Sequence, residues 1–394
     1  MSGILDSLKT FIQGTGIAQL MEQNDWYLTL IMFAISGVLV YLAIVKQFEP
    51  LLLLPIAIGM LLTNIPGANI YHPEYFLVDY PDYLEILQKG GLLDLLYIGV
   101  KCGLYPCLIF IGIGAMTDFT PLIANPKSLL IGAGAQLGVF VAFAAALLLG
   151  FTPVEAASIG IIGGADGPTA ITVTKALASH LLPAIAIAAY SYMALIPMIQ
   201  PPFMKLFTTK KERMIRMTTL RDVSKTEKIV FPVLVTLVVG LIVPDALVLI
   251  GCLMFGNLIN VCGVTDRLSK TAQNELMNIV TIMLGISVGA TATAQNFLNW
   301  QTLGIIACGL TAFAISTCGG LITAKIMCWV TGGKINPLIG SAGVSAVPMA
   351  ARVSQKVGSR EDPTNFLLMH AMGPNVAGVI GSAVAAGVFL SWFK

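Results

Sequence analysis

Apolar residues run along this chain in long blocks, and polar residues collect in the shorter stretches between the blocks. A helix needs about 20 consecutive apolar residues to cross the hydrocarbon core of a membrane. Blocks of roughly this length recur throughout the sequence, although the shorter ones need tilt or a partner to cross. We therefore predict about ten membrane spans, at 26–45, 51–62, 92–113, 129–150, 181–197, 229–243, 246–259, 277–294, 303–330 and 366–392.

Two of the polar stretches, 153–175 and 336–352, differ from ordinary connecting loops. Both are rich in glycine, serine and proline, yet they carry few charges for segments that would face water. Irregular backbone at membrane depth is tolerated only where protein or a water-filled cavity surrounds it. We predict that both stretches are re-entrant hairpins buried in the protein.

Asp166 lies in the first of these stretches, within Gly-Gly-Ala-Asp-Gly-Pro-Thr at 163–169. A carboxylate at membrane depth is energetically expensive, so it usually marks an ion path or a proton relay. The helix-breaking residues around it expose backbone carbonyls and helix ends, which transporters use to hold ions. We interpret the segment as a cation site; the alternative is a loop turn whose Asp bonds to its own backbone. The residues that break the helix are Gly163, Gly164, Gly167 and Pro168.

The two hairpins look like counterparts in an internal repeat. The sequence Gly-Ala-Asp-Gly-Pro-Thr-Ala at 164–170 is echoed by Val-Ser-Ala-Val-Pro-Met-Ala at 344–350, and 112–117 resembles 285–291. Broken apolar segments at matching positions of two halves indicate a transport site between them. Small-residue runs are also typical of helix-packing faces, and the two interpretations are compatible.

Composition sets the class of protein. The chain of 394 residues is 56% hydrophobic and 11% charged, with a mean hydropathy of +0.86, which excludes a soluble domain. The net charge of +2 gives no reason to expect nucleic-acid binding, which needs a basic face. The seven cysteines are scattered without a Cys-x-x-Cys pair, so we expect neither a metal framework nor disulfides.

Charge also predicts the domain organisation. The segment 205–228 is strongly basic, so it should face the cytoplasm and divide a first membrane half (26–204) from a second (229–394). The acidic segment 65–91 then faces the outside. Residues 1–25 have apolar positions at helical spacing, which predicts an amphipathic helix rather than a cleavable signal. That helix could lie at the membrane interface or over the protein's own surface.

Four motifs resemble a known family. They are Tyr-Leu-Ala-Ile-Val-Lys-Gln-Phe-Glu-Pro at 41–50, Gly-Ile-Gly-Ala-Met-Thr-Asp-Phe at 112–119, the segment 163–169, and Gly-Pro-Asn-Val-Ala-Gly at 373–378. They resemble the beta subunit of sodium-pumping biotin-dependent decarboxylases, and the resemblance covers nearly the whole chain. It implies an all-α, inverted-repeat, elevator-like transporter in a prokaryotic cytoplasmic membrane. It also implies an enzyme that decarboxylates carboxybiotin and exports sodium.

The resemblance further implies cofactors and partners. The cofactors are a sodium ion and carboxybiotin, the latter carried by a partner subunit. A carboxyltransferase alpha subunit transfers the carboxylate from a substrate to a biotin carrier protein. A small gamma or delta membrane subunit and a homo-oligomer are also implied. Which substrate feeds the complex is decided in another subunit, so this sequence does not identify it.

Roles follow from the resemblance residue by residue. Asp166 matches the essential sodium-site aspartate, and Tyr192 matches a tyrosine of the coupled ion and proton chemistry. A further polar set matches the second hairpin and the last motif: Asn336, Gly340, Ser345, Arg352 and Asn375. Sodium is a hard cation that prefers oxygen ligands, which suits Asp166, Asn336, Ser345 and Asn375. The permanently charged, planar Arg352 suits the carboxylate of carboxybiotin.

Each of these residues also has a structural interpretation. The Asn and Ser side chains could be hydrogen bonds between helices, and Tyr192 could be packing or an interfacial anchor. Arg352 could be a helix-end charge that reaches toward water. The same architecture would also serve an organic-anion transporter or a sodium/proton antiporter without enzymatic activity. The family motifs, Gly-Gly-Ala-Asp-Gly-Pro-Thr above all, favour the decarboxylase.

Overall fold

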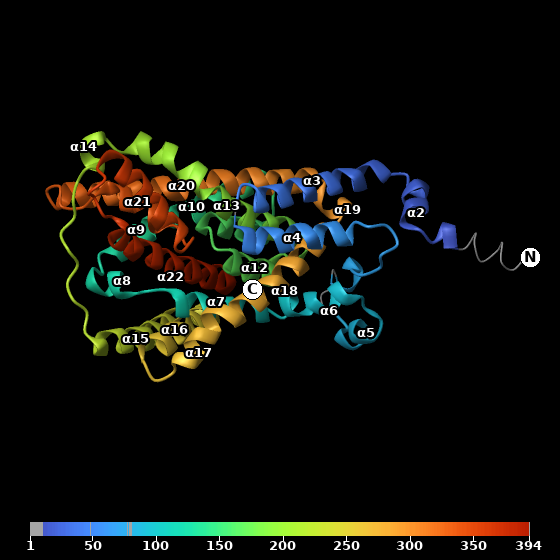
Figure 1. Cartoon of the computed structure of the whole chain (residues 1–394), viewed down its shortest axis with the longest axis horizontal. Coiled ribbons are helices and arrows are strands. Elements are labelled where there is room, and N and C mark those ends of the chain that lie inside the picture. The colour runs from blue at the N-terminus through green and yellow to red at the C-terminus, as the bar shows by residue number, and fades with distance from the viewer. Residues whose placement is uncertain (1–10, 48, 77, 79–80, 394) are drawn as a thin grey trace, which may run out of the picture.

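The computed structural model describes residues 11–47, 49–76, 78 and 81–393, and this part of the chain contains helices and no strand (Figure 1). The predicted all-α class is therefore confirmed. The α-helices are, in chain order, α2 (Gly16–Glu22), α3 (Trp26–Ile44), α4 (Pro50–Thr63), α5 (Tyr83–Lys89), α6 (Leu92–Lys101), α7 (Leu104–Met116), α8 (Thr120–Ala124), α9 (Ser128–Ala135), α10 (Leu137–Leu148), α11 (Pro153–Gly160), α12 (Gly167–Leu177), α13 (Leu182–Phe207), α14 (Lys210–Arg213), α15 (Lys225–Ile242), α16 (Leu247–Val261), α17 (Asp266–Thr271), α18 (Met277–Ala290), α19 (Ala294–Phe297), α20 (Trp300–Val330), α21 (Met349–Glu361) and α22 (Leu368–Phe393).

Short tight turns join several of these helices. Most are 3-10 turns, and η5 is a π-helical turn that leads into α18. They are η1 (Pro73–Tyr75), η2 (Ile161–Gly164), η3 (Ser179–Leu181), η4 (Pro244–Ala246), η5 (Ala272–Leu276) and η6 (Pro337–Gly343). Two of them, η2 and η6, fall in the predicted hairpins and interrupt what would otherwise be longer helices.

The described helices include five that are long and apolar enough to cross a membrane, or seven if each of two bent pairs is one span. The chain is thus a multi-pass membrane protein. Every predicted span coincides with a helix or a pair of helices, but the number of ten crossings stays a prediction. Helices such as α4 and α18, of 14 residues each, are shorter than the roughly 20 residues that a straight crossing needs.

The bent pairs have local causes. The helices α6 and α7 meet at 66° around Gly103, whose φ of 79° lies in the left-handed region that favours glycine. The second bend, of 65°, divides α13 between Tyr190 and Leu195. Pro197 follows closely, and a proline inside a helix removes a backbone hydrogen bond and bends the axis.

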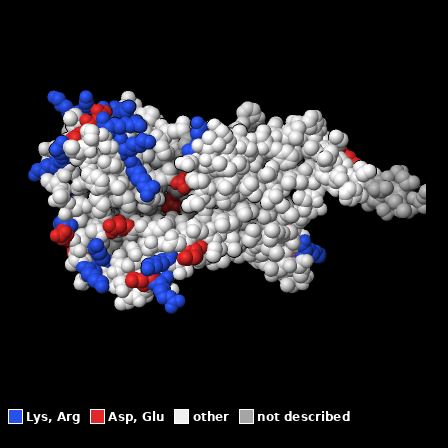
Figure 2. All heavy atoms as spheres, in the orientation of Figure 1, with Lys and Arg blue, Asp and Glu red and all other residues white. Residues whose placement is uncertain are grey.

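The helices form an elongated bundle (Figure 1). Figure 2 shows Lys and Arg gathered at the end that carries α14 and α21, whereas the middle of this face is almost uncharged. The opposite end carries α2, α5 and α6. An uncharged belt between two polar ends is what a membrane-embedded surface requires. Residues 1–10 of the predicted amphipathic helix lie outside the described residues.

The basic segment (205–228) is fastened to the second half of the chain. Arg213 pairs with Glu361 at 2.9 Å, and Arg216 pairs with Asp362 at 2.8 Å, so both bonds hold the end of α21. Hydrogen bonds from Thr364, together with the bond from Arg216, lower the pKa of Asp362. Its carboxylate therefore stays charged at neutral pH.

Two buried asparagines reinforce this attachment. The side-chain amides of Asn336 and Asn365 both donate to the carbonyl oxygens of Arg213 and Ile215. Because both asparagines are buried, losing one of these bonds leaves a polar group without a partner, which costs about 1–3 kcal/mol. The basic segment is therefore more than a solvated loop.

We expect Asn365→Ala to release the basic segment. The initial rate of trypsin cleavage within 214–224 of the intact protein should rise about tenfold, since each 1.4 kcal/mol changes an opening equilibrium tenfold. The exposed Asn274, which bonds within its own turn, gives the matched control Asn274→Ala. Equal cleavage of the two variants would show that the asparagine bonds do not hold the segment.

Candidate functional site

The first hairpin consists of α11, the turn η2 and α12. Thr152 and Glu155 cap the start of α11 by bonding to each other's backbone. The turn ends at Ala165, whose φ of 56° reverses the chain direction. Asp166 then caps α12, because its Oδ1 atom accepts a hydrogen bond of 3.2 Å from the backbone N–H of Thr169.

The predicted helix-breaking residues all lie at this reversal. Gly163 and Gly164 end η2, and Gly167 and Pro168 open α12. A Cβ atom at Gly163 would come within 2.7 Å of the backbone of Gly138 in α10. The tip of the first hairpin therefore lies directly against α10, and only a residue without a side chain fits there.

The second hairpin packs in the same way. Asn336 caps η6, with its Oδ1 atom 3.0 Å from the N–H of Leu338. A Cβ atom at Gly340 would lie 2.3 Å from the carbonyl oxygen of Gly320 in α20. After η6 the chain runs through 344–348 into α21. Each hairpin thus packs a glycine against the backbone of an apolar helix, which is α10 for the first hairpin and α20 for the second.

The tips of the two hairpins meet. The backbone N–H of Ser345 donates to the carbonyl of Gly164 at 3.1 Å. Its hydroxyl donates to the carbonyl of Gly378 in α22 at 2.9 Å. On the other side, the hydroxyl of Ser316 in α20 donates to the carbonyl of Gly163 at 2.6 Å. Two distant segments of the sequence, together with α20 and α22, therefore form one small polar region.

Asp166 lies in this region and is 6% exposed. Its Oδ2 atom accepts a hydrogen bond of 2.6 Å from the hydroxyl of Ser382 in α22. Within the described part of the chain, no Lys, Arg or His forms an ion pair with it. A buried carboxylate without a positive partner is costly, so it favours either a proton or a bound cation.

Several buried oxygens near the tips lack a hydrogen-bond partner. The amide of Asn375 is oriented by its nitrogen, which donates to the carbonyls of Ala342 and Val344 at 3.0 and 2.7 Å. The amide of Gln136 is oriented by donating to Gly378 at 3.2 Å. The unpartnered atoms are Asn375 Oδ1, Gln136 Oε1, Thr169 Oγ1 and the hydroxyl of Tyr190.

This donor set fits a hard monovalent cation. Native proteins leave few buried polar atoms unpartnered, and an ion accounts for such a group in a polar site. Carboxylate, amide and hydroxyl oxygens are the ligands that hard cations prefer. The described residues contain no group of three or more His, Cys, Asp or Glu that could hold a metal. The site therefore offers one carboxylate and neutral oxygens.

The structure brings together three of the four predicted sodium ligands. Asp166, Ser345 and Asn375 all lie where the hairpin tips meet α22. Asn336 lies at the start of the second hairpin, where its side chain bonds to Arg213, Ile215 and Leu338. These bonds already occupy its amide. Its role as a sodium ligand stays a prediction.

The other two predicted site residues, Arg352 and Tyr192, lie on α21 and α13. Arg352 is exposed on the first turn of α21. Burial raises the pKa of Glu49, and the positive charge of Arg352 opposes that rise. Arg352 is therefore electrostatically close to the loop between α3 and α4, which ends in the Phe-Glu-Pro of the motif at 41–50. Tyr192 belongs to α13, but its side chain lies outside the described residues.

Sequence reasoning missed four residues of the site: Gln136, Thr169, Tyr190 and Ser382. Tyr190 is fully enclosed and its ring lies against Gly167, where a Cβ atom would come within 2.3 Å of a ring carbon. A sequence signal existed for Gln136 and Ser382, because each is a polar residue inside an apolar span. Only the fold shows which of many such residues converge on Asp166.

Comparison with known proteins identifies the family of this chain. Residues 28–393 match the family described as the Na⁺-transporting oxaloacetate decarboxylase beta subunit. The chain belongs to this family. The resemblance inferred from the four motifs is thereby confirmed.

Relatives within the beta-subunit family match along their full length. The methylmalonyl-CoA decarboxylase subunit beta of Propionigenium modestum is 58% identical over 99% of this chain and 100% of its own. The glutaconyl-CoA decarboxylase subunit beta of Acidaminococcus fermentans is 55% identical, covering 99% of each chain. The oxaloacetate decarboxylase beta chain of Klebsiella pneumoniae is 50% identical over 98% of this chain and 99% of its own.

We expect Ser382→Ala to weaken the use of sodium by this beta subunit. A hydrogen bond to a charged group contributes about 1.5–3 kcal/mol, so the sodium concentration for half-maximal decarboxylation should rise at least about tenfold. The matched control is Ser287→Ala, since Ser287 is equally buried but bonds only to Met283 in its own helix. An unchanged sodium dependence in Ser382→Ala would remove this serine from the site.

The same titration decides the role of Asn336. If Asn336→Ala shifts the sodium dependence without faster trypsin cleavage in 214–224, this asparagine is a ligand. If cleavage accelerates and the sodium dependence is unchanged, it is an anchor for the basic segment.

Proposed function

We propose that this chain is the membrane subunit that decarboxylates carboxybiotin and couples the release of carbon dioxide to sodium export. The observation that carries the proposal is the enclosed Asp166 carboxylate, which has no cationic partner in the described protein and has unpartnered oxygens around it. The membership in a family described as sodium-transporting supports the identity of the ion.

Asp166 supplies the charged ligand for sodium in this proposal. Asn375 and Ser345 supply neutral oxygens from α22 and the second hairpin, and Ser382 orients the carboxylate. Helices broken at the ion site leave backbone carbonyls free to coordinate as well. The ion would then hold two hairpins and α22 together by contacts that exist only while it is bound.

Arg352 grips the carboxylate of carboxybiotin. Its guanidinium is exposed on the first turn of α21, so a biotin arm can reach it from the polar end of the molecule. The planar fork of Arg forms two parallel hydrogen bonds to a carboxylate, which a lysine cannot do. The shared hairpin connects this grip to the residues beside Asp166.

Decarboxylation consumes one proton. The bond between the biotin nitrogen and the carboxylate carbon breaks, carbon dioxide leaves, and the nitrogen takes a proton in its place. Sodium binding at Asp166 displaces a proton that can serve this step, with Tyr192 assigned to the proton chemistry by the family motif. The enclosed hydroxyl of Tyr190, beside Gly167, is a second group that can hold this proton.

The energy of the reaction limits how many ions move. Carrying one charge against a potential of 100 mV requires about 2.3 kcal/mol. A decarboxylation that releases several kcal/mol can therefore export about one or two sodium ions. Tight coupling requires that the ion cannot cross unless carboxybiotin is consumed.

An inverted repeat supports an elevator-like movement. The helices α4 and α18 cross at two glycines. Gly59 of α4 lies against the backbone of α18, and Gly289 of α18 lies against the backbone of α4. The helices α7 and α16 cross in the same way through Gly114 and Gly256. An exchange of α4 with α16 and of α7 with α18 maps one crossing onto the other, and we propose that the same exchange relates the two hairpins. We propose that these four helices are the frame and that the hairpins move against it.

The basic end faces the cytoplasm in this proposal, as the positive-inside rule predicts. Carboxybiotin on its carrier protein, and the carboxyltransferase alpha subunit, then approach the end with α14 and α21 (Figure 2). A small gamma or delta subunit and further copies of this chain complete the complex. The relatives are named for different substrates, so the substrate is selected outside this chain.

Asp166→Asn should abolish both activities. The amide keeps the shape of the carboxylate but not the charge that binds the ion, so sodium transport and carboxybiotin decarboxylation should fall at least about 100-fold. Assembly in the membrane should be unchanged. The measurement is sodium uptake and carbon dioxide release by vesicles with the cytoplasmic face outward, with Asp266→Asn as an exposed control. Normal sodium-dependent turnover by Asp166→Asn would refute the proposed site.

Arg352→Lys should impair the use of carboxybiotin rather than of sodium. The concentration of carboxybiotin for half-maximal rate should rise about tenfold or more, while sodium activation at saturating carboxybiotin should change little. Arg360→Lys is the matched control, since Arg360 is exposed on the same helix. Loss of sodium affinity with normal carboxybiotin dependence would assign Arg352 to the ion path. Anion uptake without decarboxylation would favour a plain transporter.

A further inference from the structure

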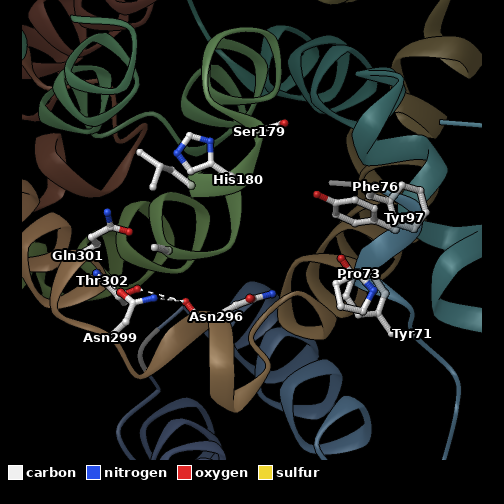
Figure 3. Close-up of a pocket in the computed structure, with 12 residues that line it drawn as sticks. Tyr71, Pro73, Phe76, Tyr97, Ser179, His180, Asn296, Asn299, Gln301 and Thr302 are labelled. Atoms are coloured by element: carbon white, nitrogen blue, oxygen red, sulfur yellow. Dashed lines mark hydrogen bonds between the residues drawn. The ribbon is translucent and has the colours of Figure 1, made fainter. Parts of the chain in front are cut away.

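A cavity of about 240 Å³ lies in the half of the molecule away from the basic end (Figure 3). Its walls come from distant segments of the chain: the loop that carries η1, Tyr97 of α6, the turn η3 with the start of α13, and the start of α20 with the preceding α19. Figure 3 shows Tyr71, Phe76 and Tyr97 on one side and the amide side chains on the other, with His180 above the amides in this view.

The cavity is connected to Asp166 by a single helix. Asp166 caps α12, which has 11 residues and so extends about 16 Å at 1.5 Å per residue. Ser179 and His180, which follow its end, line the cavity. The cavity therefore lies beyond the outer end of the first hairpin, while α14 and α21 lie at the opposite end of the molecule (Figure 1).

The lining selects for a monovalent cation. No Lys, Arg, Asp or Glu of the described residues lines the cavity. Of the described lining residues only His180 can carry a positive charge, and it pairs with Glu155. An anion therefore finds no unpaired positive group, and a divalent cation finds no carboxylate among the lining residues. What the cavity offers is neutral amide and hydroxyl oxygen, from Ser179, Asn296 and Gln301, together with aromatic faces. Neutral oxygens hold a hydrated monovalent ion weakly, and aromatic faces attract cations.

Two of these side chains are available to a ligand. Asn299 and Thr302 are already used in the turn, where both bond to the backbone of Asn296. The side chains of Asn296 and Gln301 form no hydrogen bond with any described residue. At about 30 Å³ per water, the cavity holds roughly eight waters, which is room for a sodium ion with its inner shell.

The wall of the cavity includes the hairpin that carries the ion site. His180 pairs with Glu155 through an Nε2 to Oε1 distance of 2.9 Å, which joins the end of α12 to the start of α11. The two outer ends of the first hairpin are thus held together at the cavity. A movement of the hairpin necessarily changes the wall that faces the ion.

We propose that this cavity is an outer sodium vestibule: a weak site that receives the ion released from Asp166 and slows the pump when outside sodium is high. The inference rests on the proposed function, because it presupposes sodium export from Asp166. Weak binding by neutral oxygens is suited to release, since a second carboxylate would hold the ion.

The test uses the intact decarboxylase complex in vesicles whose cytoplasmic face points outward. Sodium inside the vesicles is varied against choline at constant ionic strength, with the membrane potential collapsed, and carbon dioxide release is measured. We expect luminal sodium to inhibit. The double variant Asn296→Ala/Gln301→Ala should need about fivefold more luminal sodium for half-inhibition, and Asn296→Asp about fivefold less. Activation by sodium on the cytoplasmic face should not shift in either variant.

The control is Gln295→Ala, an exposed amide in the same turn that does not line the cavity. Inhibition that is equal in all variants would place the effect at Asp166 and overturn the vestibule. A shift in the same direction for Asn296→Asp and for the double variant would also overturn it, because a change of packing does not follow the added charge. If decarboxylation needs no sodium on the cytoplasmic face, the proposed function fails first, and this result is distinct from the other two.

Discussion

A buried carboxylate that has no cationic partner among the described residues is the constraint on which the rest of this structure depends. Asp166 is largely shielded from water, so its charge must be met by hydrogen bonds, by a proton or by an ion. Two hydrogen bonds reach it, from Thr169 and Ser382. They orient the carboxylate but do not neutralise it. The cation that we propose at Asp166 would neutralise this charge, so that occupancy of the site and its structure would depend on each other.

Placing that carboxylate between helix ends requires breaking two helices inside the membrane. Broken backbone leaves carbonyls and N–H groups that lipid cannot satisfy. The protein meets this requirement with side chains from intact helices. Ser316 donates to the carbonyl of Gly163, and Gln200 donates to the carbonyl of Ser341 at 2.8 Å. Asn375 donates to the carbonyl of Ala342 in η6 and to that of Val344 just beyond it. Polar residues inside apolar helices are therefore the support of the hairpins as well as candidates for the ion path.

Hydropathy and helix-breaking residues predicted much of this arrangement. The apolar blocks located every long helix, and α20 differs from its predicted span only by beginning at Trp300. The motif around Asp166 identified the carboxylate because charge at membrane depth is rare. The convergence of Gln136 and Ser382 on the same point could not be predicted, since it depends on how α9, α10 and α22 pack. The bonds of Asn336 to Arg213 and Ile215 could not be predicted either, and its role as a sodium ligand stays a prediction.

The reciprocal crossings of α4 with α18 and of α7 with α16 bear on how the chain is made. In both crossings the backbones touch, and one partner belongs to each half of the sequence. Membrane insertion proceeds from the N-terminus, so α4 emerges more than two hundred residues before α18. Contacts this distant in sequence form late. The helices of the first half therefore enter the membrane with their glycine faces unpacked, and both crossings can form only after α18 has been synthesised.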